Sequence, residues 1–197
     1  KPFTQMISSR GCPAKCTFCV LENHWGKIQR MRSAKNVLDE IEFLIATYGI
    51  KEIHFEDDNL TADKKRAIEI FDGMIKRGFN INWQSPSGIA VYTLDDEILE
   101  KMKKSGCYNI PLGIESGDQE VLSKLMHKPV NLKKVTELVK KIRALGMGVK
   151  GFFILGFPDE TKESILRTIE FAKSLELDWT LFFIAAPLPG SPLYHLC

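Results

Sequence analysis

Three cysteines crowd into one short segment near the start of the chain. Cys12, Cys16 and Cys19 have the spacing Cys-x-x-x-Cys-x-x-Cys and come directly after the first expected strand. This spacing is poor for a disulfide framework and favours metal ligation in a reducing compartment. Each thiolate can take one iron corner of a cubane cluster, which normally uses four cysteines. With three local ligands, one iron keeps an open site that amino and carboxylate groups can chelate.

Two other interpretations of this segment stay open. Zinc accepts a mixture of thiolate and imidazole ligands, so the three cysteines together with His24 could hold a zinc ion in a binding module. Cys16 and Cys19 could instead form a thioredoxin-like redox pair. The other cysteines stand alone: we expect Cys107 to be a small buried residue and assign no role to Cys197.

Length and composition indicate one globular domain. The chain has 197 residues, of which 44% are hydrophobic and 26% charged, with a net charge of +2. Basic and acidic residues are interleaved, so no basic face indicates a nucleic-acid partner. No apolar run is long enough for a membrane span or a signal peptide, and we expect a cytoplasmic protein. Because the sequence starts without Met and stops within a loop-to-helix signal, we expect 1–197 to be the core domain of a larger protein.

Short β-rich runs alternate with amphipathic helical patterns along the whole chain. Strands are predicted at 3–8, 51–56, 81–84, 108–114, 149–155 and 179–186. Helices between them are predicted from apolar residues at helical spacing, with caps at Ser33, Thr93 and Asn131 and glycine stops. The helix after the second strand is expected to bury a stripe of three residues, namely Ile68, Phe71 and Ile75.

This alternation predicts an α/β fold with a parallel sheet and right-handed crossovers. Six strand–helix units fit a partial barrel as well as a flat doubly wound sheet, and periodicity does not decide between them. In both folds ligands gather at the carboxyl ends of the strands.

Polar and glycine-rich motifs stand at those strand ends. They are Phe-Glu-Asp-Asp-Asn at 55–59, Gly-Ile-Glu-Ser-Gly at 113–117, Phe-Ile-Leu-Gly-Phe-Pro-Asp-Glu-Thr at 153–161 and Pro-Leu-Pro-Gly-Ser-Pro-Leu-Tyr at 187–194. Together with the cysteine motif and Phe18 before its last cysteine, they resemble the radical S-adenosylmethionine (SAM) superfamily over essentially the whole chain. The sequence is similar in particular to the subgroup often found behind a cobalamin-binding domain. That subgroup also resembles the methylthiotransferases and the oxygen-independent coproporphyrinogen oxidases.

The resemblance implies a partial (β/α)6 barrel that holds a [4Fe–4S] cluster and SAM. A low-potential donor such as flavodoxin or ferredoxin would reduce the cluster, and reductive cleavage of SAM would give a 5′-deoxyadenosyl radical. Cobalamin, from a domain outside this sequence, would be a further cofactor for methyl transfer. A methylthiotransferase is the alternative enzyme; it would need a second cysteine-ligated cluster. The substrate is not revealed, and no catalytic residue is assigned.

Carried over by position, the resemblance implies SAM contacts for several residues. Phe18 is expected beside the adenine, and Asp57 and Asp58 near the ammonium group. The chain has these acids where many relatives have Gly-Gly-Glu. An acid suits an ammonium ion electrostatically, but the same pair could cap the following loop or helix.

Further contacts are implied at later strand ends. Ser87 and Glu115 are expected to reach the carboxylate and ribose, and Ser116 could do either. A structural ion pair is the alternative for Glu115. Four residues of the last two strand ends are expected to contact the adenine: Ile154, Gly156, Ala185 and Ala186. For the two alanines, core packing is the alternative.

Overall fold

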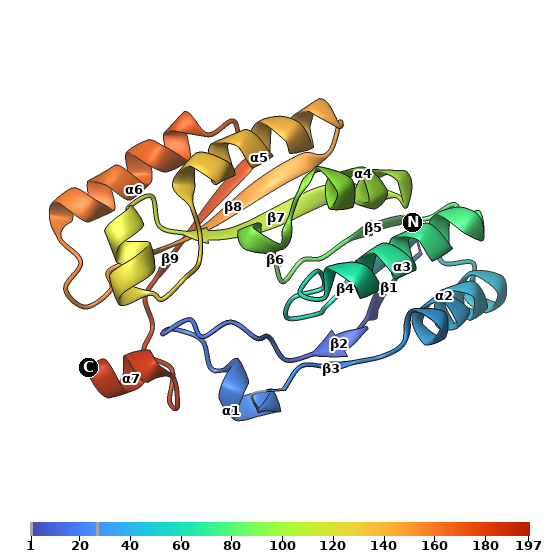
Figure 1. Ribbon diagram of the computed structural model, residues 1–197, viewed down its shortest axis with the longest axis horizontal. Coiled ribbons are helices and arrows are strands. Elements are labelled where there is room, and N and C mark those ends of the chain that lie inside the picture. Colours follow the sequence, from blue (N-terminus) through green and yellow to red (C-terminus); the bar gives the residue numbers. More distant parts are fainter. Residues whose placement is uncertain (1, 27) are drawn as a thin grey trace.

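The computed structural model describes residues 2–26 and 28–197, built around one large parallel sheet (Figure 1). Its strands lie in the spatial order β1, β4, β5, β7, β8, β9, and the short β6 also pairs with β7. All of these pairings are parallel. The bounds are β1 Phe3–Met6, β4 Glu52–Phe55, β5 Asn82–Gln84, β6 Ile89–Ala90, β7 Cys107–Glu115, β8 Gly148–Leu155 and β9 Trp179–Ile184. The six predicted strands and the open, partial-barrel order are confirmed.

Five helices cross over between successive strands. They are α2 Ala34–Tyr48, α3 Lys64–Lys76, α4 Asp96–Lys104, α5 Leu132–Ala144 and α6 Lys162–Ser174. Figure 1 shows them along the outer side of the curved sheet, while the small elements lie across its other side. These small elements are β2 Ser9–Arg10, β3 Arg30–Met31, α1 Leu21–Trp25 and α7 Pro192–Leu196. Two single-turn segments complete the fold, the 3₁₀ helix η1 Val91–Thr93 and the π-helix η2 Val121–Leu125.

Side-chain caps fix where the helices begin. The Ser33 hydroxyl accepts a hydrogen bond from Asn36 N, and the Asn131 side chain accepts from the first turn of α5, as predicted. The predicted cap of α4 at Thr93 is wrong. Thr93 closes η1, where its hydroxyl donates to Ala90 O, and Asp95 caps α4 instead. A carboxylate two residues further on offered the better acceptor for the free N–H groups.

The buried face of α3 differs from the predicted stripe. Phe71 is fully buried, but Ile75 is 39% exposed, and Ile70 and Met74 fill the space against the sheet. The stripe is therefore shifted by one residue toward the N-terminus of the helix. Arg66 shares this buried face because its guanidinium donates to two backbone carbonyls, Ser8 O and Arg32 O.

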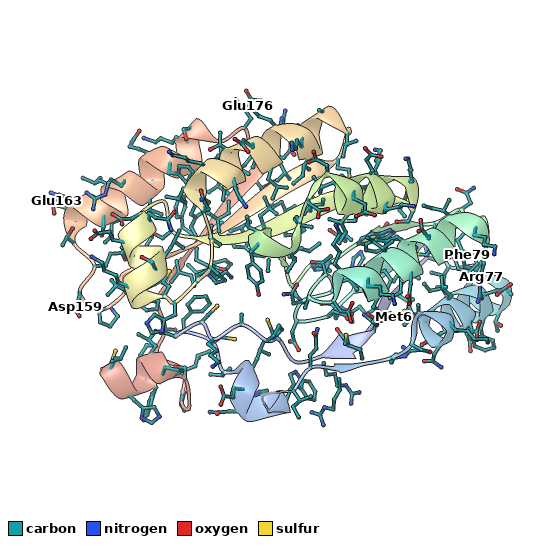
Figure 2. The ribbon with its side chains drawn as sticks, in the orientation of Figure 1. Met6, Arg77, Phe79, Asp159, Glu163 and Glu176 are labelled. Carbon is teal, nitrogen blue, oxygen red and sulfur yellow. The ribbon has the colours of Figure 1, made fainter. Side chains whose placement is uncertain are left out.

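The core fills the space between the sheet and the outer helices. Figure 2 shows side chains packed throughout this layer, with Glu163 and Glu176 at the outer surface. At its centre Trp83 is fully buried, stacks on Phe71 and donates from Nε1 to the Ser105 hydroxyl. Cys107 is buried in this core, as expected. Within the described residues, no helix has the length and apolar character needed to cross a membrane.

Candidate functional site

The three clustered cysteines open onto one cavity. Cys12, Cys16 and Cys19 line a hollow of about 810 Å³ at the carboxyl ends of the strands. Sites for small molecules and cofactors typically have volumes of about 300–1,000 Å³. The cysteines come from the loop between β2 and α1, so the loop forms one wall of the cavity and the sheet another.

Hydrogen bonds from distant segments hold the cysteine loop. Gly11, whose φ is 90°, donates from its N–H to Asp58 Oδ2 at 2.7 Å. A side chain at Gly11 would meet Ile28 O at 3.2 Å in a backbone conformation that favours glycine. Thr17 donates from its N–H to Met126 O and from its hydroxyl to Leu125 O, just after η2. These contacts position the loop against two distant segments of the chain.

The three thiols have different surroundings. Burial raises the pKa of Cys16 to about 11, although Lys128 acts in the opposite direction. Burial also raises the pKa of Cys19, against a hydrogen bond from the backbone of Leu21. Asn59 Nδ2 donates to Cys12 Sγ over a long 3.9 Å. A metal bound here would have to supply the energy to deprotonate Cys16 and Cys19.

The donor set fits a cluster better than a single ion. All five cysteines are free thiols. Within residues 2–26 and 28–197, no three His, Cys, Asp or Glu side chains are close enough to hold one metal ion. A structural zinc site places four ligands around one centre, and the three cysteines with His24 are not grouped in that way among the described residues. A cubane cluster takes each thiolate at a separate iron, which three thiols spread along one cavity wall can provide.

The two acids after β4 have different environments. Asp57 is fully buried and accepts hydrogen bonds from Ser8 N at 2.9 Å and from the hydroxyls of Ser8 and Ser9 at 2.6 Å. It does not line the cavity. Asp58 does line the cavity while it accepts from Gly11 N. Only the second acid of the pair is therefore available to a ligand there.

Glu115, at the end of β7, faces the cavity from an unusual backbone. Its φ is 72°, and the register between β7 and β8 shifts between Gly113 and Glu115. Such bulges re-aim side chains next to functional sites. Lys128 Nζ donates to Glu115 Oε1 at 2.8 Å, with both side chains only about a tenth exposed, at 11% and 10%. A Cβ at Gly113 would come within 2.8 Å of Glu115 Oε1, so this glycine leaves room for the carboxylate.

Lys128 remains a cation in this setting. Burial lowers its pKa, but the neighbouring Glu115 carboxylate, which also accepts its hydrogen bond, outweighs burial and raises the pKa overall. Its ammonium also lies 5.7 Å from the centre of the Phe18 ring. Lys128 and Glu115 together put opposite charges on one wall of the cavity.

The remaining sequence-predicted residues divide into two groups. Phe18 and Ser87 line the cavity, and the Ser87 hydroxyl also donates to Glu56 Oε2. Ser116 is fully buried, hydrogen-bonds to the Thr168 hydroxyl and accepts from Asp118 N. The second group lies outside the cavity lining and comprises Asp57, Ser116, Ile154, Gly156, Ala185 and Ala186.

Sequence reasoning assigned no role to several residues of the cavity, among them Lys128, Tyr92 and Asn59. Lys128 follows η2 in an irregular segment and belongs to no periodic pattern. Tyr92 lies in η1, and burial followed by the charge of Cys12 raises its pKa to about 12. Asn59 directly follows the two acids at the end of β4, so its position in that motif was a signal that could have identified it.

Known proteins match this chain across nearly its whole length. The family model of the radical SAM superfamily matches residues 6–172. Cytidylyl-2-hydroxyethylphosphonate methyltransferase of Streptomyces wedmorensis is 40% identical, covering 98% of this chain and 37% of the relative. An uncharacterized methyltransferase of Pyrococcus horikoshii is 39% identical, covering 98% of this chain and 42% of its own length. The chain thus spans about two fifths of these relatives.

A solved structure supports the fold. The radical SAM methyltransferase TsrM of Kitasatospora setae, with tryptophan and a SAM analogue bound, superposes with a TM-score of 0.89 at 20% identity. The superposition covers 98% of this chain and 38% of TsrM. Family match, fold and cysteine loop agree: the chain belongs to the radical SAM superfamily, whose enzymes use a [4Fe–4S] cluster and SAM.

Proposed function

We propose that Cys12, Cys16 and Cys19 hold the [4Fe–4S] cluster and that SAM binds at its open iron. The observation that carries this proposal is the convergence of three thiols and a buried Lys128–Glu115 pair on one cavity. Bound there, these cofactors supply a 5′-deoxyadenosyl radical, or a methyl group for transfer with cobalamin. The two relatives at 40% and 39% identity are methyltransferases, which favours methyl transfer to an unidentified substrate by the whole protein.

The charges of the cavity match those of SAM. Asp58 offers a carboxylate to the N–H groups of the SAM amino group, and Lys128 offers a cation to the SAM carboxylate. Glu115 is the acceptor that we assign to the ribose hydroxyls. Phe18 and Ser87 line the same cavity, in keeping with contacts to adenine and to the carboxylate. Contacts of adenine with Ile154, Gly156 and Ala186 stay predictions of the resemblance.

Cofactors and partners of the whole protein belong to this proposal. Because the chain spans about two fifths of its relatives, cobalamin would come from a domain outside it. A low-potential flavodoxin or ferredoxin would deliver the electron to the cluster. A reducing cytoplasm suits a chain whose five cysteines are all free thiols.

Anaerobic reconstitution with iron and sulfide tests the cluster site. We expect about four irons per chain, and loss of the cluster when Cys12, Cys16 or Cys19 is changed to Ala. Cys107→Ala is the matched control, because Cys107 is buried in the core away from the cavity, and it should keep the iron. Stoichiometric zinc without iron or sulfide in anaerobic protein would contradict the proposal.

SAM binding is tested on the reduced cluster. Adding SAM should change the electron paramagnetic resonance spectrum, since its amino and carboxylate groups reach the open iron. If the cluster is intact but its spectrum does not change when SAM is added, the cluster serves only electron transfer.

A further inference from the structure

The segment that carries the cysteines has an excess of positive charge. Residues 10–32 contain five basic residues and one acid, Glu22, so this segment has a net charge of +4. Charge of one sign gathered on one segment guides partners of the opposite sign to that surface.

Two of these basic residues face each other on the β2–β3 ribbon. Arg10 and Arg30 are direct cross-strand neighbours in an antiparallel pair. Like charges directly opposite each other destabilise such a pair. The Arg10 guanidinium lies 5.3 Å from the centre of the Trp25 ring, and Arg30 donates to Trp25 O at 2.8 Å. Neither arginine forms an ion pair with any described residue.

The neighbouring Arg32 shows what a structural arginine looks like here. It pairs with Glu40, and it also donates to the Asn36 side chain and to Ile7 O. Arg10 and Arg30 are both exposed and lack such a carboxylate within the described part of the chain. Their charges are therefore free for an external anionic surface.

Apolar side chains accompany the two arginines. Ile28 is 75% exposed and Met31 is 41% exposed, beside the partly buried Trp25. Arginine, methionine and aromatic residues are enriched in protein interfaces. We call the surface formed by Arg10, Trp25, Ile28, Arg30 and Met31 the arginine ribbon. It lies outside the cavity lining, so SAM does not need it.

We propose that the arginine ribbon is the docking surface for an acidic electron-transfer protein that reduces the cluster. Arg10 stands two residues before Cys12, so a protein bound here approaches the cluster from outside the cavity. In the step, one electron leaves the reduced iron–sulfur centre of a ferredoxin and enters the oxidised cluster, which passes from the 2+ to the 1+ state. No bond forms or breaks, and no proton moves. Complexes of this kind are small and depend on electrostatic steering.

The proposal rests on the proposed cluster site, and the experiment separates the two. The cluster-loaded chain is mixed with a reduced acidic ferredoxin in a stopped-flow instrument, and cluster reduction is followed by absorbance. The double variant Arg10→Gln/Arg30→Gln should be reduced roughly tenfold more slowly, with a weaker dependence on salt. Iron and sulfide content must match the parent; absence of a cluster would refute the proposed function instead.

Two controls isolate docking from other effects. Lys133→Gln/Lys134→Gln removes two exposed charges from α5 and should leave the rate unchanged. Reduced methyl viologen, a small cation, should reduce the arginine variant at least as fast as the parent. A parental rate and salt dependence in the arginine variant would overturn the proposal. If the arginine variant loses its cluster, the parent chain alone still tests the proposal. A rate of cluster reduction by ferredoxin that does not depend on ionic strength in the parent would also overturn the proposal.

Discussion

The ends of β4 and β7 carry the same signal in the sequence, two adjacent polar residues, yet the members of each pair have separate tasks. At β4, Asp57 is enclosed by Ser8 and Ser9, and Asp58 lines the cavity. At β7 the order is reversed: Glu115 lines the cavity, and Ser116 turns to Thr168 behind it. One polar residue of each pair therefore faces the cavity, and the other holds neighbouring parts of the chain.

The largest expected effect is on stability, from Asp57→Asn. Three donors converge on the buried carboxylate, and an amide would turn one acceptor into a donor that faces them. Each hydrogen bond to a charged group contributes about 1.5–3 kcal/mol. We expect a loss of roughly 3 kcal/mol or more in the free energy of unfolding, measured by urea denaturation of the metal-free chain. A parental midpoint would show that Asp57 is free to serve a ligand.

Glu115→Gln tests Glu115, the residue of the Glu115–Ser116 pair that lines the cavity at the end of β7. The change keeps the shape but removes the charge that accepts from Lys128. We expect SAM affinity to fall roughly ten- to a hundredfold by isothermal titration, with unchanged iron content. Glu120→Gln is the matched control, because Glu120 is exposed and pairs only along its own helical turn with Lys124. Parental affinity with a lower melting temperature would make Glu115 a structural ion-pair partner and the ribose assignment wrong.

The strands, their parallel pairing and two of the three expected caps could be predicted because they depend on local pattern. Alternating apolar strands and glycine-stopped helices leave few topologies, and Ser33 and Asn131 cap through neighbours three residues away or fewer. The different environments of Asp57, which is buried, and Asp58, which lines the cavity, could not be predicted. Periodicity ends with the strand, and the burial of Asp57 depends on Ser8 and Ser9, about fifty residues earlier.

Lys128 shows a second limit of sequence reasoning. It reaches Glu115 from the segment after η2, where His127 has a φ of 49°. A left-handed residue between a π-helical turn and a lysine has no periodic signature. The β2–β3 ribbon was missed for a similar reason, since strands of two residues give no alternation to detect.

Asp58→Asn tests the cavity-lining acid after β4, and its expected effect on SAM binding is smaller. The amide oxygen can still accept from Gly11 N, so the loop should stay in place while the negative charge is lost. We expect roughly tenfold weaker SAM binding, from one charge-assisted hydrogen bond. Iron content and melting temperature should match the parent. If binding is unchanged, Asp58 serves only to hold Gly11, and both acids of the pair are structural.

The smallest expected effect comes from Ser116→Ala. The hydroxyl bonds to Thr168 and accepts from Asp118 N, so its removal leaves a backbone donor unsatisfied in a buried position. The cost should be about 1 kcal/mol, a fall in melting temperature of about 2–4 °C for a chain of this size. SAM affinity should not change, because Ser116 does not line the cavity. Ser123→Ala is the control for losing a hydroxyl at an exposed site. Weaker SAM binding by Ser116→Ala at parental stability would show that both residues at the end of β7 serve the ligand.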